Sequence, residues 1–95
     1  MSRPLIYAAN WKMNHGLKET TEFLQTFLPL ARDAQALDLV IAPPFTSLTA
    51  ASALLQKSGA PVRLGAQNVH WEPSGAFTGE ISASMLAEAG CDYVI

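Results

Sequence analysis

Hydrophobic positions along the chain follow two patterns, one of short continuous runs and one with helical spacing. The continuous runs are Leu5 to Ala9, Leu37 to Ala42, Val62 to Ala66 and Tyr93 to Ile95. Runs of this length predict strands, and an apolar run without alternation is typical of a strand covered on both faces of a sheet. The third run is the weakest of the four because Arg63 and Gly65 interrupt it.

Helical spacing predicts three helices between these strands. Their ranges are Leu17 to Arg32, Ser47 to Lys57 and Ser82 to Ala89. In the first, Phe23, Leu24, Phe27 and Leu28 recur three and four residues apart and so share one face.

Single residues predict where the helices begin and end. Thr46 and Ser82 are placed to accept hydrogen bonds as N-caps, and Gly59 and Gly90 follow the second and third helices as stop signals. Pro29 lies inside the first pattern, where it has no N–H and clashes with the carbonyl four residues earlier. We therefore expect the first helix to kink or restart near Pro29.

The alternation of strands and helices predicts an α/β fold with a parallel sheet and right-handed crossovers. The chain has 95 residues, of which 49 % are hydrophobic and 15 % charged, fewer charged residues than a small domain needs to cover its surface. The pattern also ends within the apolar run Tyr93 to Ile95. We therefore expect residues 1–95 to be the N-terminal part of a single, incomplete domain.

Charge and cysteine content exclude several classes of function. Six Lys and Arg against eight Asp and Glu give a net charge of −2, which argues against nucleic acid or an anionic membrane surface as a partner. The single cysteine, Cys91, cannot form an internal disulfide or a Cys-rich zinc site, which favours a reducing compartment. No apolar run reaches the roughly 20 residues of a membrane span, and no signal peptide is apparent. We expect a cytoplasmic protein without a membrane partner.

Candidate chemistry lies where strands end, because ligands of parallel α/β proteins bind beyond the carboxyl ends of the strands. Asn10 and Lys12 follow the first strand two residues apart, and an extended backbone there would point both side chains the same way. An amide donor beside an ammonium suits a small anionic substrate. The alternative, a lysine that is merely solvated, stays open on these residues alone.

Four motifs occur in order along the chain. They are Ala9 to Asn14, Ile41 to Phe45, Gly65 to Asn68 and Gly75 to Ser82. Together they resemble the triosephosphate isomerase family over essentially all 95 residues. The resemblance implies a (β/α)₈ barrel, the TIM barrel, of which this chain holds the first three βα units and the start of the fourth strand.

The same resemblance implies the chemistry. It is a proton transfer of glycolysis and gluconeogenesis that interconverts dihydroxyacetone phosphate and glyceraldehyde 3-phosphate through an enediolate, with no cofactor and no metal. Asn10 carries over as a substrate-orienting residue, and Lys12 as a catalytic and substrate-binding residue. The family's histidine electrophile and glutamate base lie beyond Ile95, so we expect the 95 residues alone to be inactive.

Other titratable residues do not match the family's catalytic positions. His15 and His70 are expected to pack in loops or to be solvated, and neither Glu72 nor Glu80 is expected to be the base. Cys91 is expected to be a buried, inert thiol.

The long loop from Gln67 to Gly79 is expected by resemblance to form a homodimer. It would pack around the partner's first loop, which carries Met13, and bring Phe77 and Thr78 to the interface, with Thr78 near the partner's Asn10. The apolar residues of the loop support this, although they could instead fold back on their own barrel.

Two other readings remain. The first is a non-catalytic structural or association module derived from the barrel. The second is a small doubly wound phosphate-binding domain, but that fold favours a glycine-rich turn after the first strand, where residues 11–14 read Trp-Lys-Met-Asn.

Overall fold

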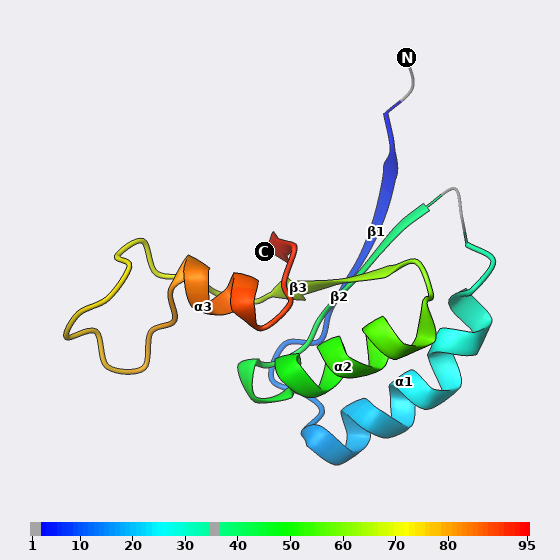
Figure 1. The fold of residues 1–95 in the computed structure, drawn as a ribbon, viewed down its shortest axis with the longest axis horizontal. Coiled ribbons are helices and arrows are strands. Elements are labelled where there is room, and N and C mark those ends of the chain that lie inside the picture. Colours follow the sequence, from blue (N-terminus) through cyan, green and yellow to red (C-terminus); the bar gives the residue numbers. More distant parts are fainter. Residues whose placement is uncertain (1–2, 35–36) are drawn as a thin grey trace.

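The computed structural model describes residues 3–34 and 37–95 (Figure 1). Its elements in chain order are β1 (Leu5–Asn10), α1 (Leu17–Ala31), β2 (Leu37–Ala42), the 3₁₀ turn η1 (Phe45–Ser47), α2 (Leu48–Ser58), β3 (Val62–Ala66), α3 (Ala83–Glu88) and β4 (Tyr93–Val94). The predicted α/β alternation is confirmed. Among the described residues, no helix is long and apolar enough to cross a membrane.

The four strands form one sheet in the order β1-β2-β3-β4, and every neighbouring pair is parallel. Ala9 pairs with Ile41 and Leu39 pairs with Val62, so the carboxyl ends of the first three strands lie at the same edge. Each strand adds next to the one before it, as in the opening part of a barrel. A doubly wound sheet reverses its strand order instead, so that alternative is wrong for the strands described here.

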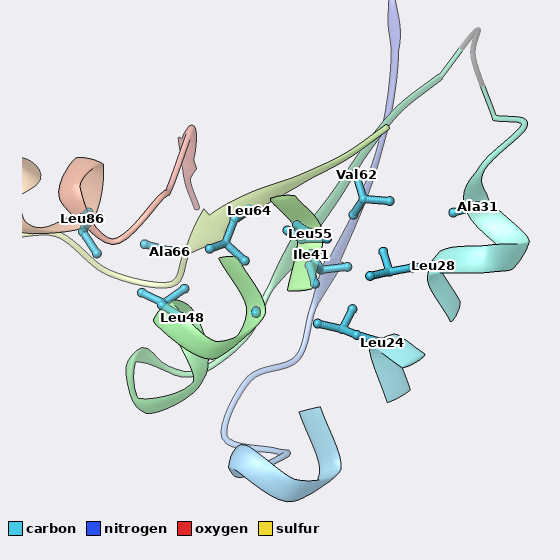
Figure 2. Close-up of a cluster of buried hydrophobic side chains, with 11 residues drawn as sticks. Leu24, Leu28, Ala31, Ile41, Leu48, Leu55, Val62, Leu64, Ala66 and Leu86 are labelled. Carbon is cyan, nitrogen blue, oxygen red and sulfur yellow. The ribbon is translucent and has the colours of Figure 1, made fainter. Parts of the chain in front are cut away.

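The core lies between the sheet and its helices (Figure 2). Leu24 of α1 is fully buried, as are Leu64 of β3 and, to within 2 %, Leu48 of α2 and Leu86 of α3. Burying each leucine contributes about 1.5–3 kcal/mol, so this cluster fixes α1 and α2 against the strands. In contrast, all six residues of β1 are exposed.

The observed helix ends test the predictions of which residues start and stop each helix. Gly59 caps α2 with a φ of 69°, and Gly90 follows α3 with a φ of 102°, so both predicted stops are confirmed. The Ser82 hydroxyl accepts a hydrogen bond from the N–H of Met85 at 3.3 Å, as an N-cap should. Ser82 is therefore confirmed as the start signal of α3.

Two positions differ from these predictions. The helix α1 continues through Pro29 to Ala31, so a restart near Pro29 is wrong. Pro29 and Gln25, whose carbonyl loses its partner, are both exposed, so water can take the place of the missing hydrogen bond. Thr46 is not an N-cap, because it lies inside η1, which delays the start of α2 to Leu48.

Candidate functional site

The loops that follow β1, β2 and β3 are joined at one edge of the sheet. The N–H of Trp11 donates to the carbonyl of Ala42 at 3.1 Å. The Gln67 side chain donates from Nε2 to the carbonyls of Lys12, at 2.8 Å, and Ala42, at 2.7 Å. The first loop also lies beside the turn between β2 and α2 (Figure 1). Parallel strands thus bring the predicted site segments together, although they are far apart in the sequence.

Lys12 has a left-handed backbone, with a φ of 55°. Its N–H donates to Oδ1 of Asn10 at 2.8 Å, so the asparagine side chain turns back on the chain. The expectation of an extended backbone through both residues is therefore wrong, because this local hydrogen bond competes with extension of the strand. Asn10 and Lys12 are nevertheless adjacent and exposed. With Oδ1 occupied, the Nδ2 group is the part of Asn10 left to donate to a ligand.

The rest of this loop is anchored to neighbouring elements. His15 also has a positive φ, of 73°, and its carbonyl accepts a hydrogen bond from Oγ of Ser47 at 3.2 Å. The imidazole ring packs edge-on against Trp11, with ring centroids 4.9 Å apart, and Trp11 packs edge-on against Phe23 at 5.3 Å. His15 therefore has the loop-packing contacts expected of it. Met13, between these anchored residues, is 94 % exposed.

The segment 67–79 projects away from the sheet as a loop (Figure 1). Its neck is closed by the N–H of His70, which donates to the carbonyl of Ile81 at 2.8 Å. The His70 ring contacts the rings of Trp71 and Phe77, both with centroids 4.3 Å away, and its Nδ1 lies 3.7 Å from a carboxylate oxygen of Glu80. His70 therefore packs within the loop, and its buried Nε2 has no hydrogen-bond partner among the described residues.

The loop encloses a hollow of about 300 Å³ on one side. Its lining includes Glu72, Phe77, Glu80 and Met85. Trp71 is 85 % exposed, so the alternative in which the loop's aromatic residues fold back on their own chain is wrong for this side chain. Phe77, in contrast, is partly covered by His70. Asn10 thus ends β1, and Lys12 and Met13 lie on the loop that follows it, whereas Phe77 and Thr78 lie on the loop 67–79.

Cys91 behaves as a structural thiol. Burial, and to a smaller extent the charge of Asp92, raise the pKa of Cys91 above its ordinary value. A raised pKa leaves less thiolate, which is the reactive form. In the part of the chain that the structure describes, no group of three or more His, Cys, Asp and Glu side chains is placed to hold a metal ion.

Sequence reasoning missed two residues that organise this edge. The sequence pattern places Gln67 only within a motif, yet its carboxamide donates to the carbonyls of both Lys12 and Ala42. The pattern places Ser47 only at the start of a helix, yet Ser47 is fully buried and donates to the carbonyl of His15. The position of Gln67 directly after β3, at the same edge of the sheet as Lys12 after β1, is the signal that could have identified it.

Comparison with known proteins identifies the family. A family model described as triosephosphate isomerase matches residues 5–95. The triosephosphate isomerase of Aquifex aeolicus (strain VF5) is 54 % identical over 90 residues, which are 95 % of this chain and 36 % of that protein. Those of Acaryochloris marina and Synechocystis sp. are 52 % and 53 % identical over 94 residues each, 98 % of this chain and 38 % of either protein.

The chain therefore spans 36–38 % of the length of these relatives. Its consecutive parallel strands and crossover helices are the opening part of a (β/α)₈ barrel. The match over residues 5–95 and the identity to these relatives lead to one conclusion: the chain belongs to the triosephosphate isomerase family.

Proposed function

We propose that this chain is the N-terminal part of a single barrel domain that interconverts dihydroxyacetone phosphate and glyceraldehyde 3-phosphate. The observation that carries the proposal is the 54 % identity to a triosephosphate isomerase over 95 % of the chain. Asn10 and Lys12 support it, because they lie two residues apart at the edge of the sheet where barrel enzymes bind substrate. As a glycolytic activity it belongs in the cytoplasm, with neither nucleic acid nor membrane as a partner.

Asn10 and Lys12 suit the charges that develop in this reaction. Removing a proton next to a carbonyl places negative charge on the carbonyl oxygen, as an enediolate. The Lys12 ammonium stabilises that charge and the substrate phosphate, while Nδ2 of Asn10 donates to a substrate oxygen and orients it. A donor of this kind contributes about 3 kcal/mol to the transition state in a dry site. The proton moves between adjacent carbons with no net oxidation, so the reaction calls for a base and an electrophile rather than a redox cofactor.

The proposal places both of those groups outside residues 1–95. Glu72 lies on the projecting loop and Glu80 directly after it, away from the sheet edge that carries Lys12. His15 and His70 pack against aromatic rings. A general base contributes about 10²–10⁴-fold in rate, so we expect no measurable turnover from a polypeptide limited to these 95 residues.

A coupled isomerase assay on the product of the complete gene tests the function. We expect turnover in the wild type and a loss of about 100-fold or more in Lys12→Ala, because its ammonium is the stabilising charge. Lys18→Ala is the matched control, since Lys18 is an exposed lysine in the first turn of α1, and its activity should be unchanged. An inactive wild type, or a Lys12→Ala variant as active as Lys18→Ala, would refute the proposal.

We also propose that the protein is a homodimer held by the loop 67–79. Met13 is 94 % exposed on a well-anchored loop, and the hollow of about 300 Å³ has room for one such side chain from a second copy. Phe77 and Thr78 would lie at this contact, with Thr78 near the partner's Asn10. Sedimentation of Met13→Asp, compared with wild type, tests this. We expect the charged variant to dissociate at micromolar concentration, and an unchanged dimer would contradict the assignment.

A second candidate function is association without catalysis. The projecting loop with its exposed Trp71 favours it, because such apolar surface is typical of contact sites. The two measurements above distinguish the candidates: a wild-type protein that self-associates through the loop but has no isomerase activity would support the association module.

A further inference from the structure

The loop between β1 and α1 contains both positive-φ residues other than glycine that occur in the described part of the chain. They are Lys12, with a φ of 55°, and His15, with a φ of 73°. Residues other than glycine rarely adopt a positive φ, and this backbone conformation persists only where the surrounding structure holds it in place. The contacts that hold these two residues are therefore part of what places the Lys12 side chain.

Both backbone polar groups of Lys12 are held by side chains. Its N–H donates to Oδ1 of Asn10 at 2.8 Å, and its carbonyl accepts from Nε2 of Gln67 at 2.8 Å. These two bonds restrain the peptide groups on either side of the Lys12 Cα, and so the direction in which its side chain leaves the backbone. Asn10 precedes Lys12 by two residues, whereas Gln67 reaches it from the end of β3.

Gln67 makes this contact from a fixed position. Its second Nε2 bond, at 2.7 Å, runs to the carbonyl of Ala42 at the end of β2, which also accepts the N–H of Trp11. The NH₂ group has two hydrogens, and these two carbonyls use both of them. Gln67 therefore has no Nε2 donor left for a substrate, and its contact with the first loop is the bond to the Lys12 carbonyl.

His15 is held in a similar way from η1, the turn that follows β2. Ser47 is fully buried in η1 and donates its hydroxyl to the His15 carbonyl at 3.2 Å. The Trp11 ring covers one side of the His15 imidazole. The loop is thus held at Lys12 by a side chain that directly follows β3, and at His15 by a side chain of η1.

We propose that Gln67 is a positioning residue for Lys12, and that Ser47 supports the same loop at His15. The proposal rests on the isomerase function proposed above, since it assigns Gln67 a role in presenting Lys12 to the substrate. It differs from a purely structural role in one measurable respect. The effect of removing Gln67 on catalysis should depend on the presence of the Lys12 ammonium.

A double-mutant cycle on the complete gene product tests Gln67. Gln67→Met keeps the length of the side chain and removes both donors; Gln56→Met, the same change at an exposed glutamine of α2, is the control. We expect Gln67→Met to lower kcat/KM about 10- to 100-fold, as misplacement of a catalytic group by about 1 Å does, and Gln56→Met to leave it unchanged. In a Lys12→Ala background, Gln67→Met should lower it less than about twofold.

The same cycle is measured by calorimetry with glycerol 3-phosphate, which has a phosphate and a three-carbon chain but no carbonyl to isomerise. The affinity for this compound completes the double-mutant cycle even if Lys12→Ala turns over too slowly for kcat/KM to be measured. Equal losses in both backgrounds, or no loss in the wild-type background, would overturn the role of Gln67. If Gln67→Met and the shorter Gln67→Asn both fail to fold, Gln67 is a structural residue and the proposal is likewise overturned.

Two further measurements separate this proposal from the function on which it rests. In a crystal structure of Gln67→Met, the φ of Lys12 should leave the left-handed region; a φ that stays near 55° overturns the proposal even where the wild type is an active isomerase. An inactive wild type refutes the isomerase function itself.

Thermal unfolding tests Ser47. Ser47→Ala should lower Tm more in the wild type than in His15→Gly, because glycine adopts a positive φ without strain. An equal decrease of Tm in the two backgrounds would overturn the role of Ser47 in holding His15.

Discussion

Gly90 and Gly59 allow backbone strain and steric overlap to be measured separately. Both follow a helix with a positive φ, of 102° and 69° respectively. A Cβ at Gly59 would meet nothing within 4 Å, whereas a Cβ at Gly90 would lie 2.9 Å from Cβ of Ser52 and closer still to its Oγ. Carbon atoms pack best at about 3.5–4.0 Å, so both alanine variants strain the backbone but only Gly90→Ala adds the overlap.

The expected losses follow from these distances. Placing a side chain in the left-handed region costs about 1–2 kcal/mol, so Gly59→Ala should lower the free energy of unfolding by that amount. Gly90→Ala adds the overlap with the buried Ser52, for which overpacking costs about 1–3 kcal/mol more. The total for Gly90→Ala is therefore about 2–5 kcal/mol.

Urea unfolding of the complete gene product, followed by tryptophan fluorescence, measures both losses. A third variant, Gly90→Ala with Ser52→Ala, removes Oγ of Ser52 but leaves its Cβ, so part of the overlap should be recovered. Equal losses for Gly59→Ala and Gly90→Ala, or no recovery in the double variant, would refute the steric argument. The helix α3 would then not be packed against Ser52 of α2 as the structure has it.

Three further outcomes are expected. Leu24→Ala, in the fully buried core, should cost about 2–5 kcal/mol in urea unfolding, whereas Leu30→Ala, at a side chain 78 % exposed, should change stability by less than about 0.5 kcal/mol. Because burial raises the pKa of Cys91, iodoacetamide should alkylate this thiol more slowly in the native chain than in the urea-unfolded chain near pH 8. The contribution of the Cys91 thiol to stability is complete below the pKa of the unfolded thiol, and it declines as the pH rises through the higher pKa of the folded thiol. Arg63→Ala should cost less than about 1 kcal/mol, because its ion pair with Asp92 spans 3.6 Å between two side chains that are more than half exposed.

The elements of this fold were predictable because their signals are local. A run such as Leu37–Ala42 and a stop such as Gly59 act within a few residues, and the structure confirms both. Pro29 and Thr46 carry local signals too, but their outcomes depend on surroundings. An exposed helix face lets the backbone tolerate the proline, and η1 places Thr46 before the start of α2.

The sequence predicted which residues form the candidate site but not their geometry. Asn10 and Lys12 were identified from their place after a strand, and both lie at the predicted edge of the sheet. Their geometry was mispredicted, because an extended strand was assumed to continue to Lys12, whose φ is 55°. Instead, the Asn10 side chain accepts a hydrogen bond from the N–H of Lys12, and a strand pattern does not predict such a bond.

By itself, the amino-acid sequence determined the order of strands and helices, the family resemblance and the pair of polar residues after the first strand. Only the tertiary structure decided how that pair is held. Gln67 lies 55 residues from Lys12, and Ser47 lies 32 residues from His15. Contacts over such distances form because parallel strands carry the ends of separate segments to one edge, where the Gln67 and Ser47 side chains donate to backbone carbonyls of the first loop.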